Sequence, residues 1–233
     1  MRLLSLIRPP FDARIDVGWD ERHVAAGLVA GLAMIMATQA PLLALLDEPV
    51  PLWVVLGLTL GLDVGVATIA ACLGPGRVRA LISLMGPRQL PILPRFSWGA
   101  LALGGSLIGL ELYVALMSNV SRDLVPPPLP ESIGKAGLRW LTFIVVVLVG
   151  PFAEELFFRG FVFAGLLRRF KLPAAVVISS ALFAAAHMDM AVAGPAFLAG
   201  SVFALVYWRT GTLWPAILAH TAQNAIAFSL SQQ

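Results

Sequence analysis

Seven stretches of mostly apolar residues constrain the fold of this 233-residue chain more than any other feature of its sequence. A helix needs about 20 apolar residues to cross the hydrocarbon core of a bilayer. Residues 24–46 meet this length without a charge, and residues 51–75 meet it with one interruption, Asp63. The other stretches cover residues 97–119, 138–167, 173–188, 191–208 and 212–230. The pattern predicts an all-α protein, a polytopic bundle of about seven transmembrane helices.

The balance of residue types agrees with a membrane protein. Hydrophobic residues make up 59% of the chain and charged residues 12%, whereas a soluble domain carries about 25% charged residues. So few charges cannot solvate a globular surface, and the net charge of +3 reflects arginine-rich loops rather than a nucleic-acid-binding face. The single cysteine, Cys72, excludes an internal disulfide, and its apolar neighbours predict a buried, unreactive side chain.

The charges between the stretches predict how the bundle is oriented. The segments that follow the second and the fourth stretch are basic and contain Arg77, Arg79, Arg88, Arg95, Arg168, Arg169 and Lys171. The segment that follows the first stretch is acidic and contains Asp47 and Glu48. Because cytoplasmic loops carry an excess of Lys and Arg, the chain is predicted to lie in the inner membrane with its N-terminus in the cytoplasm.

Polar residues inside the last four stretches are the candidates for function, since an ionisable side chain in a bilayer costs from about 2.5 kcal/mol upward. They are Glu154, Glu155, Arg159, His187, His220 and Asn224. Glu155 and Arg159 are one helical turn apart and are predicted to form an ion pair. Glu154 is rotated from Glu155 by about 100° and is free to point elsewhere. His220 and Asn224 are also one turn apart, so both project from one helix face.

These candidates are predicted to lie at similar depths in the membrane. Glu154 precedes Arg168 by 14 residues, and His187 lies 14 residues into its own stretch, so each is about 21 Å from the cytoplasmic end of its helix. His220 follows Arg209 by 11 residues, which places it at about 16 Å. Three separate helices therefore bring a glutamate and two histidines to comparable depth, which scattered structural residues would not need to do.

Three short motifs contain these residues in order: "EELFFR" from Glu154, "FAAAH" ending at His187, and "HTAQN" from His220. As a set they resemble the CPBP family of intramembrane proteases, which includes CAAX prenyl endopeptidases and Abi-like bacteriocin-processing or immunity proteins. The resemblance covers roughly residues 138–230. We therefore expect a juxtamembrane segment (1–23), N-terminal transmembrane helices and loops (24–130), and a catalytic transmembrane domain (131–233).

The resemblance implies an endopeptidase that uses an activated water molecule. Glu154 and His187 would hold and deprotonate the water, with Glu154 as the general base. His220 and Asn224 would donate hydrogen bonds to the oxyanion of the tetrahedral intermediate, where each donor can contribute about 2.7–4 kcal/mol. The substrate would be a membrane-bound or lipidated protein, or a leader peptide, cleaved near the bilayer.

The supporting groups and the cofactor follow from the same resemblance. Glu155 with Arg159 would fix the helix face and neutralise local charge. The family has been described both as metal-dependent and as metal-independent, so the cofactor is either zinc or none. If zinc is present, Glu154, His187 and His220 would be its three protein ligands.

The sequence leaves two alternative functions possible and two acidic residues without a role. A buried set of acids, an arginine and histidines could relay protons in a proton-coupled transporter, and a non-proteolytic immunity or scaffold protein could use the same residues to bind a peptide. The substitution Glu154→Gln separates them, because it should abolish a protease and largely spare a binder. Asp63 and Glu111 are intramembrane acids outside the three motifs and have no assigned role.

Overall fold

The computed structural model describes residues 17–44, 50–74, 92–127 and 137–231, and within these ranges it contains helices and no strand. The first three long helices are α2 (Glu21–Ala44), α3 (Leu52–Leu73) and α5 (Ile92–Met117), and a short 3-10 turn, η1 (Arg122–Leu124), follows. The last three are α10 (Leu172–Ala186), α11 (Met190–Thr210) and α12 (Trp214–Leu230). The prediction of an all-α bundle is confirmed.

A composite helix over Arg139–Leu166 lies between these two groups in the sequence. Its consecutive segments are α7 (Arg139–Thr142), η2 (Phe143–Val149), α8 (Gly150–Glu155), η3 (Leu156–Phe163) and α9 (Ala164–Leu166). The segments η2 and η3 are π-helical, with wider turns that are rare and frequent at functional sites. Pro151 offers no N–H to the helix ladder, and next to it the N–H of Gly150 donates to the carbonyl of Val145, five residues back.

The helices agree with the seven predicted stretches to within about five residues at each end, and the described chain is that of a multi-pass membrane protein. Among the described residues, four helices are long and apolar enough to cross a membrane: α3, residues Pro94–Met117 of α5, the composite helix, and α11. The helix α10 is apolar but shorter, at 15 residues.

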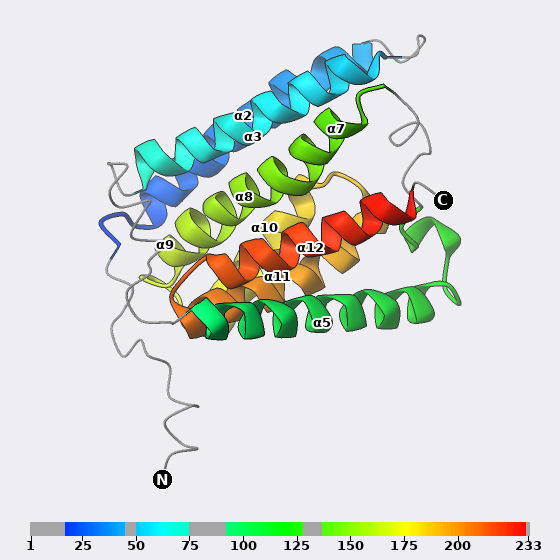
Figure 1. Ribbon diagram of the computed structural model, residues 1–233. Helices are drawn as coiled ribbons and strands as arrows, with labels where there is room; N and C mark the ends of the chain where they lie inside the picture. Colours follow the sequence, from blue (N-terminus) through cyan, green and yellow to red (C-terminus); the bar gives the residue numbers. More distant parts are fainter. Residues whose placement is uncertain (1–16, 45–49, 75–91, 128–136, 232–233) are drawn as a thin grey trace.

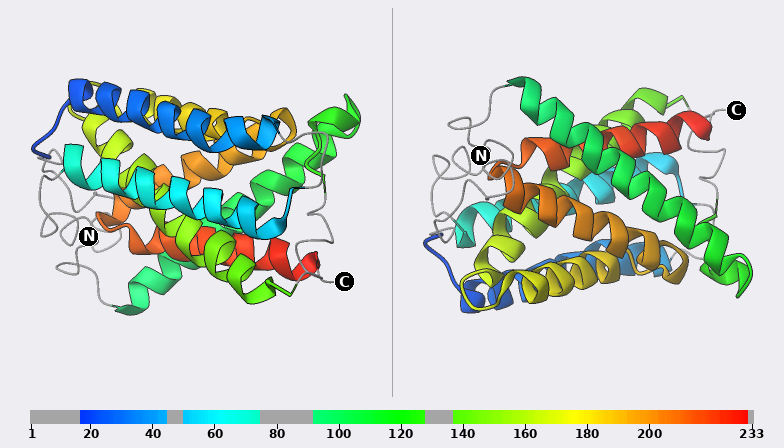
Figure 2. Two further views of the ribbon diagram at one scale, coloured as in Figure 1. Left: turned by 90° about the horizontal axis from the view of Figure 1, so that it is seen from above. Right: turned by 90° about the horizontal axis from the view of Figure 1, so that it is seen from below.

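The composite helix occupies the middle of the bundle (Figure 1). It packs on one side against α2 and α3 and on the other against α10, α11 and α12, while α5 covers α11 and α12 from outside. Figure 2 shows α2 and α3 in front when the bundle is seen from above, and α5 in front when it is seen from below. Every residue of η3 is buried, as expected of a segment that is apolar apart from Arg159 and is surrounded by other helices. This central helix carries Glu154 and Glu155.

Some sequence predictions differ from the structure or lie outside the described residues. The prediction that Cys72 is buried is wrong: its side chain, near the C-terminal end of α3, is exposed. The arginines at 77, 79 and 88 and the acids at 47 and 48, on which the orientation depends, lie outside the described residues. Orientation and the boundary at residue 131 therefore stay predictions.

Candidate active site

A buried ion pair forms the centre of the candidate site. Glu155 and Arg159 are 0% and 1% exposed, and Nη1 of Arg159 donates to Oε1 of Glu155 across 2.9 Å, as the one-turn spacing predicts. The same Oε1 atom lies 2.9 Å from Nδ1 of His220, which ties α12 to the composite helix. Because an ionised carboxylate can only accept hydrogen bonds, Nδ1 of His220 is the atom that carries the hydrogen.

Two phenylalanine rings enclose this pair from the side of α10 and α11. The guanidinium carbon of Arg159 lies 4.3 Å from the ring centroid of Phe183 and 5.4 Å from that of Phe203. The Phe203 ring also stacks on His220, with centroids 5.4 Å apart. Gly200 makes this approach possible, because a Cβ there would lie 3.1 Å from the Phe183 ring and 3.2 Å from Nη2 of Arg159.

The sequence analysis did not identify Phe203 or Gly200 as part of the site. Phe183 begins the motif "FAAAH", but the motif does not show that its ring contacts Arg159. No motif marks Gly200 and Phe203, although they are three positions apart and therefore on one face of α11. A small residue followed at that spacing by an aromatic one is too common in membrane helices to point to a site.

Glu154 does not take part in the ion pair. Its side chain is 30% exposed, and its Oε2 atom lies 3.8 Å from Nε2 of His220, which is beyond hydrogen-bond distance. His220 thus stands between the two glutamates, with Nδ1 facing Glu155 and Nε2 facing Glu154. Of the two neighbouring acids, one is buried and paired, and the other is accessible and close to an imidazole.

The turn between α10 and α11 positions His187. Met188 has a left-handed backbone (φ 51°), and the side chain of Asp189 caps α11 by accepting a hydrogen bond from the backbone amide of Ala191 at 2.8 Å. Nδ1 of His187 lies 2.9 Å from the carbonyl oxygen of Phe183 and donates to it. Its Nε2 atom therefore carries the lone pair and can accept a proton.

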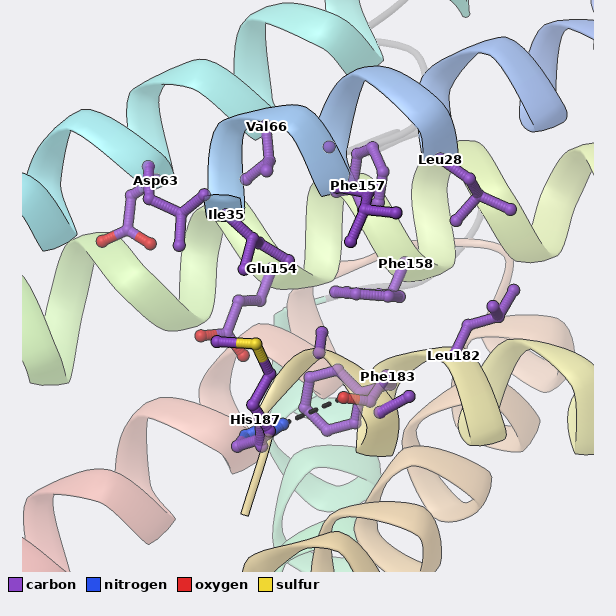
Figure 3. Close-up of a pocket in the computed structure, with 16 residues that line it drawn as sticks. Leu28, Ile35, Asp63, Val66, Glu154, Phe157, Phe158, Leu182, Phe183 and His187 are labelled. Carbon is purple, nitrogen blue, oxygen red and sulfur yellow. Dashed lines mark hydrogen bonds between the residues drawn. The ribbon is translucent and has the colours of Figure 1, made fainter. Parts of the chain in front are cut away.

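Glu154 and His187 line one cavity of about 340 Å³ (Figure 3). Its walls come from α2, α3, α8, η3 and the end of α10 and are mostly apolar. Figure 3 shows Glu154 directed towards His187 at one end, with Leu28 and Leu182 at the other. The first two helices carry no recognised motif, yet they supply nearly half of the lining residues. The cavity is therefore built from both sides of the predicted boundary at residue 131.

Asn224 is the candidate that the structure leaves apart from this cluster. Its amide nitrogen donates to the backbone carbonyl of Val146 in η2 at 2.9 Å, so the donor predicted for an oxyanion is already engaged. The structure brings together five of the six predicted residues, through Glu155, His220 and the ring of Phe183.

The remaining candidates were a zinc site and two unassigned acids. Among the described residues, no three His, Cys, Asp or Glu side chains lie close enough to hold a metal ion, so Glu154, His187 and His220 do not fit zinc in this arrangement. Glu111 is exposed on α5 and is not among the residues that line the cavity. Asp63, in contrast, is 4% exposed and lines the cavity beside Glu154.

Comparison with known proteins locates the resemblance in the same part of the chain. Residues 136–226 match the family described as "Type II CAAX prenyl endopeptidase Rce1-like". A protein of Bacillus subtilis (strain 168), named "Putative membrane peptidase YdiL", is 36% identical over 84 residues. That alignment covers 36% of this chain and 34% of the relative, so the chain spans about a third of the relative's length. The chain matches no solved structure. All six polar candidates fall within residues 136–226.

Proposed function

We propose that this chain is an intramembrane endopeptidase of the CPBP family. The proposal starts from the match of residues 136–226 to the CAAX prenyl endopeptidase family. The enzyme would hydrolyse a peptide bond of a membrane-bound or lipidated protein, or of a leader peptide, close to the bilayer. The observation that carries the proposal is the unequal state of the two adjacent glutamates: Glu155 is buried and paired with Arg159, while Glu154 faces a cavity with His187.

Glu154 is the proposed general base. Its carboxylate takes a proton from a water molecule held between it and Nε2 of His187, and the water oxygen forms a bond to the carbonyl carbon of the substrate. When the carbon–nitrogen bond breaks, Glu154 returns that proton to the departing amine. The apolar walls of the cavity favour this chemistry, because electrostatic interactions are stronger where water is excluded.

His220 is the proposed donor to the oxyanion. With its Nδ1 hydrogen directed at Glu155, its Nε2 atom can donate to the oxyanion only as an imidazolium, which has a hydrogen on both ring nitrogens. Asn224 would join as second donor after leaving the carbonyl of Val146. Glu155 and Arg159 act through His220 and are positioning residues. Zinc would supply a polarised water if it were bound, but the observed arrangement of acids and histidines does not favour it.

The proposed setting is the inner membrane, with the N-terminus in the cytoplasm and the bilayer itself as a partner. Of the two basic segments on which this depends, the one with Arg168, Arg169 and Lys171 lies within the described residues, and Arg77, Arg79 and Arg88 of the other are known from the sequence alone.

The test compares new protein termini in membranes from cells that express wild type, Glu154→Gln or Glu111→Gln at equal levels. Glutamine keeps the shape of Glu154 and removes the base, so the new termini of the wild type should disappear in Glu154→Gln. Glu111→Gln changes an acid that does not line the cavity and should leave the termini unchanged. Identical terminus profiles for wild type and Glu154→Gln would refute the proposal and favour a peptide-binding immunity or scaffold protein, or a transporter.

A further inference from the structure

Asp63 is a buried acid that the proposed mechanism does not use. It lies in the middle of α3, 4% of its surface is exposed, and its Oδ2 atom has no hydrogen-bond partner among the described residues. Burying a carboxyl group in an apolar helix is costly unless a partner compensates it. The uncompensated oxygen atom therefore indicates a ligand.

The Asp63 carboxyl group lies close to the reactive end of the cavity. A Cβ placed on Gly150 would be 3.6 Å from Oδ2 of Asp63 and 3.9 Å from Oε1 of Glu154, so both carboxyl groups border the same small space. Figure 3 shows Asp63 at the end of the cavity where Glu154 and His187 lie. Gly150 leaves this space open, because a Cβ there would contact both carboxyl groups and would be tight only against the carbonyl oxygen of Val145, at 3.3 Å.

The charges of the cavity are one-sided. Asp63 and Glu154 are its two acids, and no Lys or Arg is among the described residues that line it. The nearest arginine in the site, Arg159, is already paired with Glu155 and lies against the ring of Phe183. His220 faces Glu154 at 3.8 Å but does not line the cavity, so Asp63 is the acid whose charge a bound cation would relieve.

We propose that Asp63 binds a positively charged side chain of the substrate, so that the enzyme prefers a lysine or arginine close to the bond it cleaves. This proposal rests on the proposed endopeptidase function and identifies Asp63 as a residue that determines substrate specificity. The aliphatic stem of such a side chain fits the apolar wall formed by residues such as Leu62 and Val66. The rings of Phe157, Phe158 and Phe183 line the same space and can add cation–π contacts.

Binding tests this proposal without relying on cleavage. The probes are two short, fluorescently labelled peptides of alanine and leucine, one with a central arginine and one with citrulline, its neutral isostere. Each is titrated in the cold against full-length wild type, Asp63→Asn and Glu111→Gln in lipid nanodiscs, and the recovered peptide is checked for intactness. We expect wild type and Glu111→Gln to prefer arginine by about tenfold or more and Asp63→Asn to lose most of that preference.

The outcomes separate this proposal from the proposed function. Equal affinity of wild type for both peptides would overturn the cation site, even if the terminus comparison establishes proteolysis. A preference for arginine that disappears in Asp63→Asn would support the site, even if wild type and Glu154→Gln yield the same termini. If Asp63→Asn does not fold, Asp63→Glu serves instead: it keeps the charge and should keep the preference, whereas loss of the preference in folded Asp63→Glu would count against the site.

Discussion

The pair of Glu155 and Arg159 allows the sharpest test of how this site is built. Replacing Arg159 by methionine keeps much of its volume but leaves the Glu155 carboxylate buried, at 0% exposure, without its cation. Removing one partner of a buried ion pair costs about 3–5 kcal/mol. The guanidinium also lies over the rings of Phe183 and Phe203, and loss of these contacts adds about 0.5–2 kcal/mol. We expect Arg159→Met to lower the free energy of unfolding by at least about 3–5 kcal/mol, the cost of losing the ion-pair partner.

The double variant Glu155→Gln/Arg159→Met should be far less destabilised than the two single variants predict together. It removes both charges, so neither is left uncompensated, and the coupling energy should reach about 2 kcal/mol. SDS titration in mixed micelles measures these free energies, with the fluorescence of the 6 tryptophans as the signal.

The production of new protein termini gives a second readout, which would not change if Glu155 and Arg159 only stabilised the fold. The double variant also replaces the carboxylate that accepts the hydrogen of Nδ1 of His220 with a neutral amide, which is a weaker acceptor, so it should fold and still produce far fewer new termini. Additivity of the single variants to within about 0.5 kcal/mol would refute the stability argument. A folded double variant with wild-type activity would refute the positioning role.

Three other changes have defined expectations. Gly200→Ala would place a Cβ 3.1 Å from Phe183 and 3.2 Å from Arg159, so it should lower the free energy of unfolding by about 1–3 kcal/mol and reduce the yield of new termini. In the control Gly104→Ala the added Cβ meets nothing within 4 Å, and the variant should stabilise α5 by up to about 1 kcal/mol. If both variants melt alike, the close packing inferred around Gly200 is wrong. Trp19→Phe removes the 2.9 Å hydrogen bond from the buried indole to the carbonyl of Phe161 and should cost about 1 kcal/mol in the same titration; an unchanged midpoint would contradict it. A reporter enzyme inserted between Arg79 and Arg88 should be active in the cytoplasm, and one inserted in the proline-rich segment 124–137 outside it, whereas the opposite pattern would reverse the predicted orientation.

Most of the fold could be predicted from the sequence because a bilayer leaves few alternatives. Apolar stretches of about 20 residues form helices in a membrane, since every backbone polar group must be satisfied within the segment. Seven helices follow the predicted stretches closely. The exposure of Cys72 could not be predicted, because in a membrane protein apolar residues cover the outside as well as the core, and hydropathy does not distinguish the two faces.

The site could be predicted in part. The one-turn spacing of Glu155 and Arg159 fixes their pairing on a helix, and the matched depths of Glu154 and His220 agree with the 3.8 Å between their side chains. The engagement of Asn224 with Val146 could not be predicted, because it depends on how closely α12 approaches η2. The same holds for Gly200 and Phe203, which matter only because α11 presents them to Arg159.

The sequence by itself determined that the chain crosses a membrane and which polar residues are costly there, because both follow from local composition. It also determined which of these residues share a helix face, because a helix repeats every 3.6 residues. The tertiary structure decided that His220 lies between the two glutamates and that Glu154 faces the cavity with His187, since this depends on where α12 and α10 place the two histidines. It also decided that α2 and α3 complete the cavity and that Asp63 belongs to it. Those contacts join residues about 90 positions apart, such as Asp63 and Glu154, and only the packing of whole helices can bring such residues together.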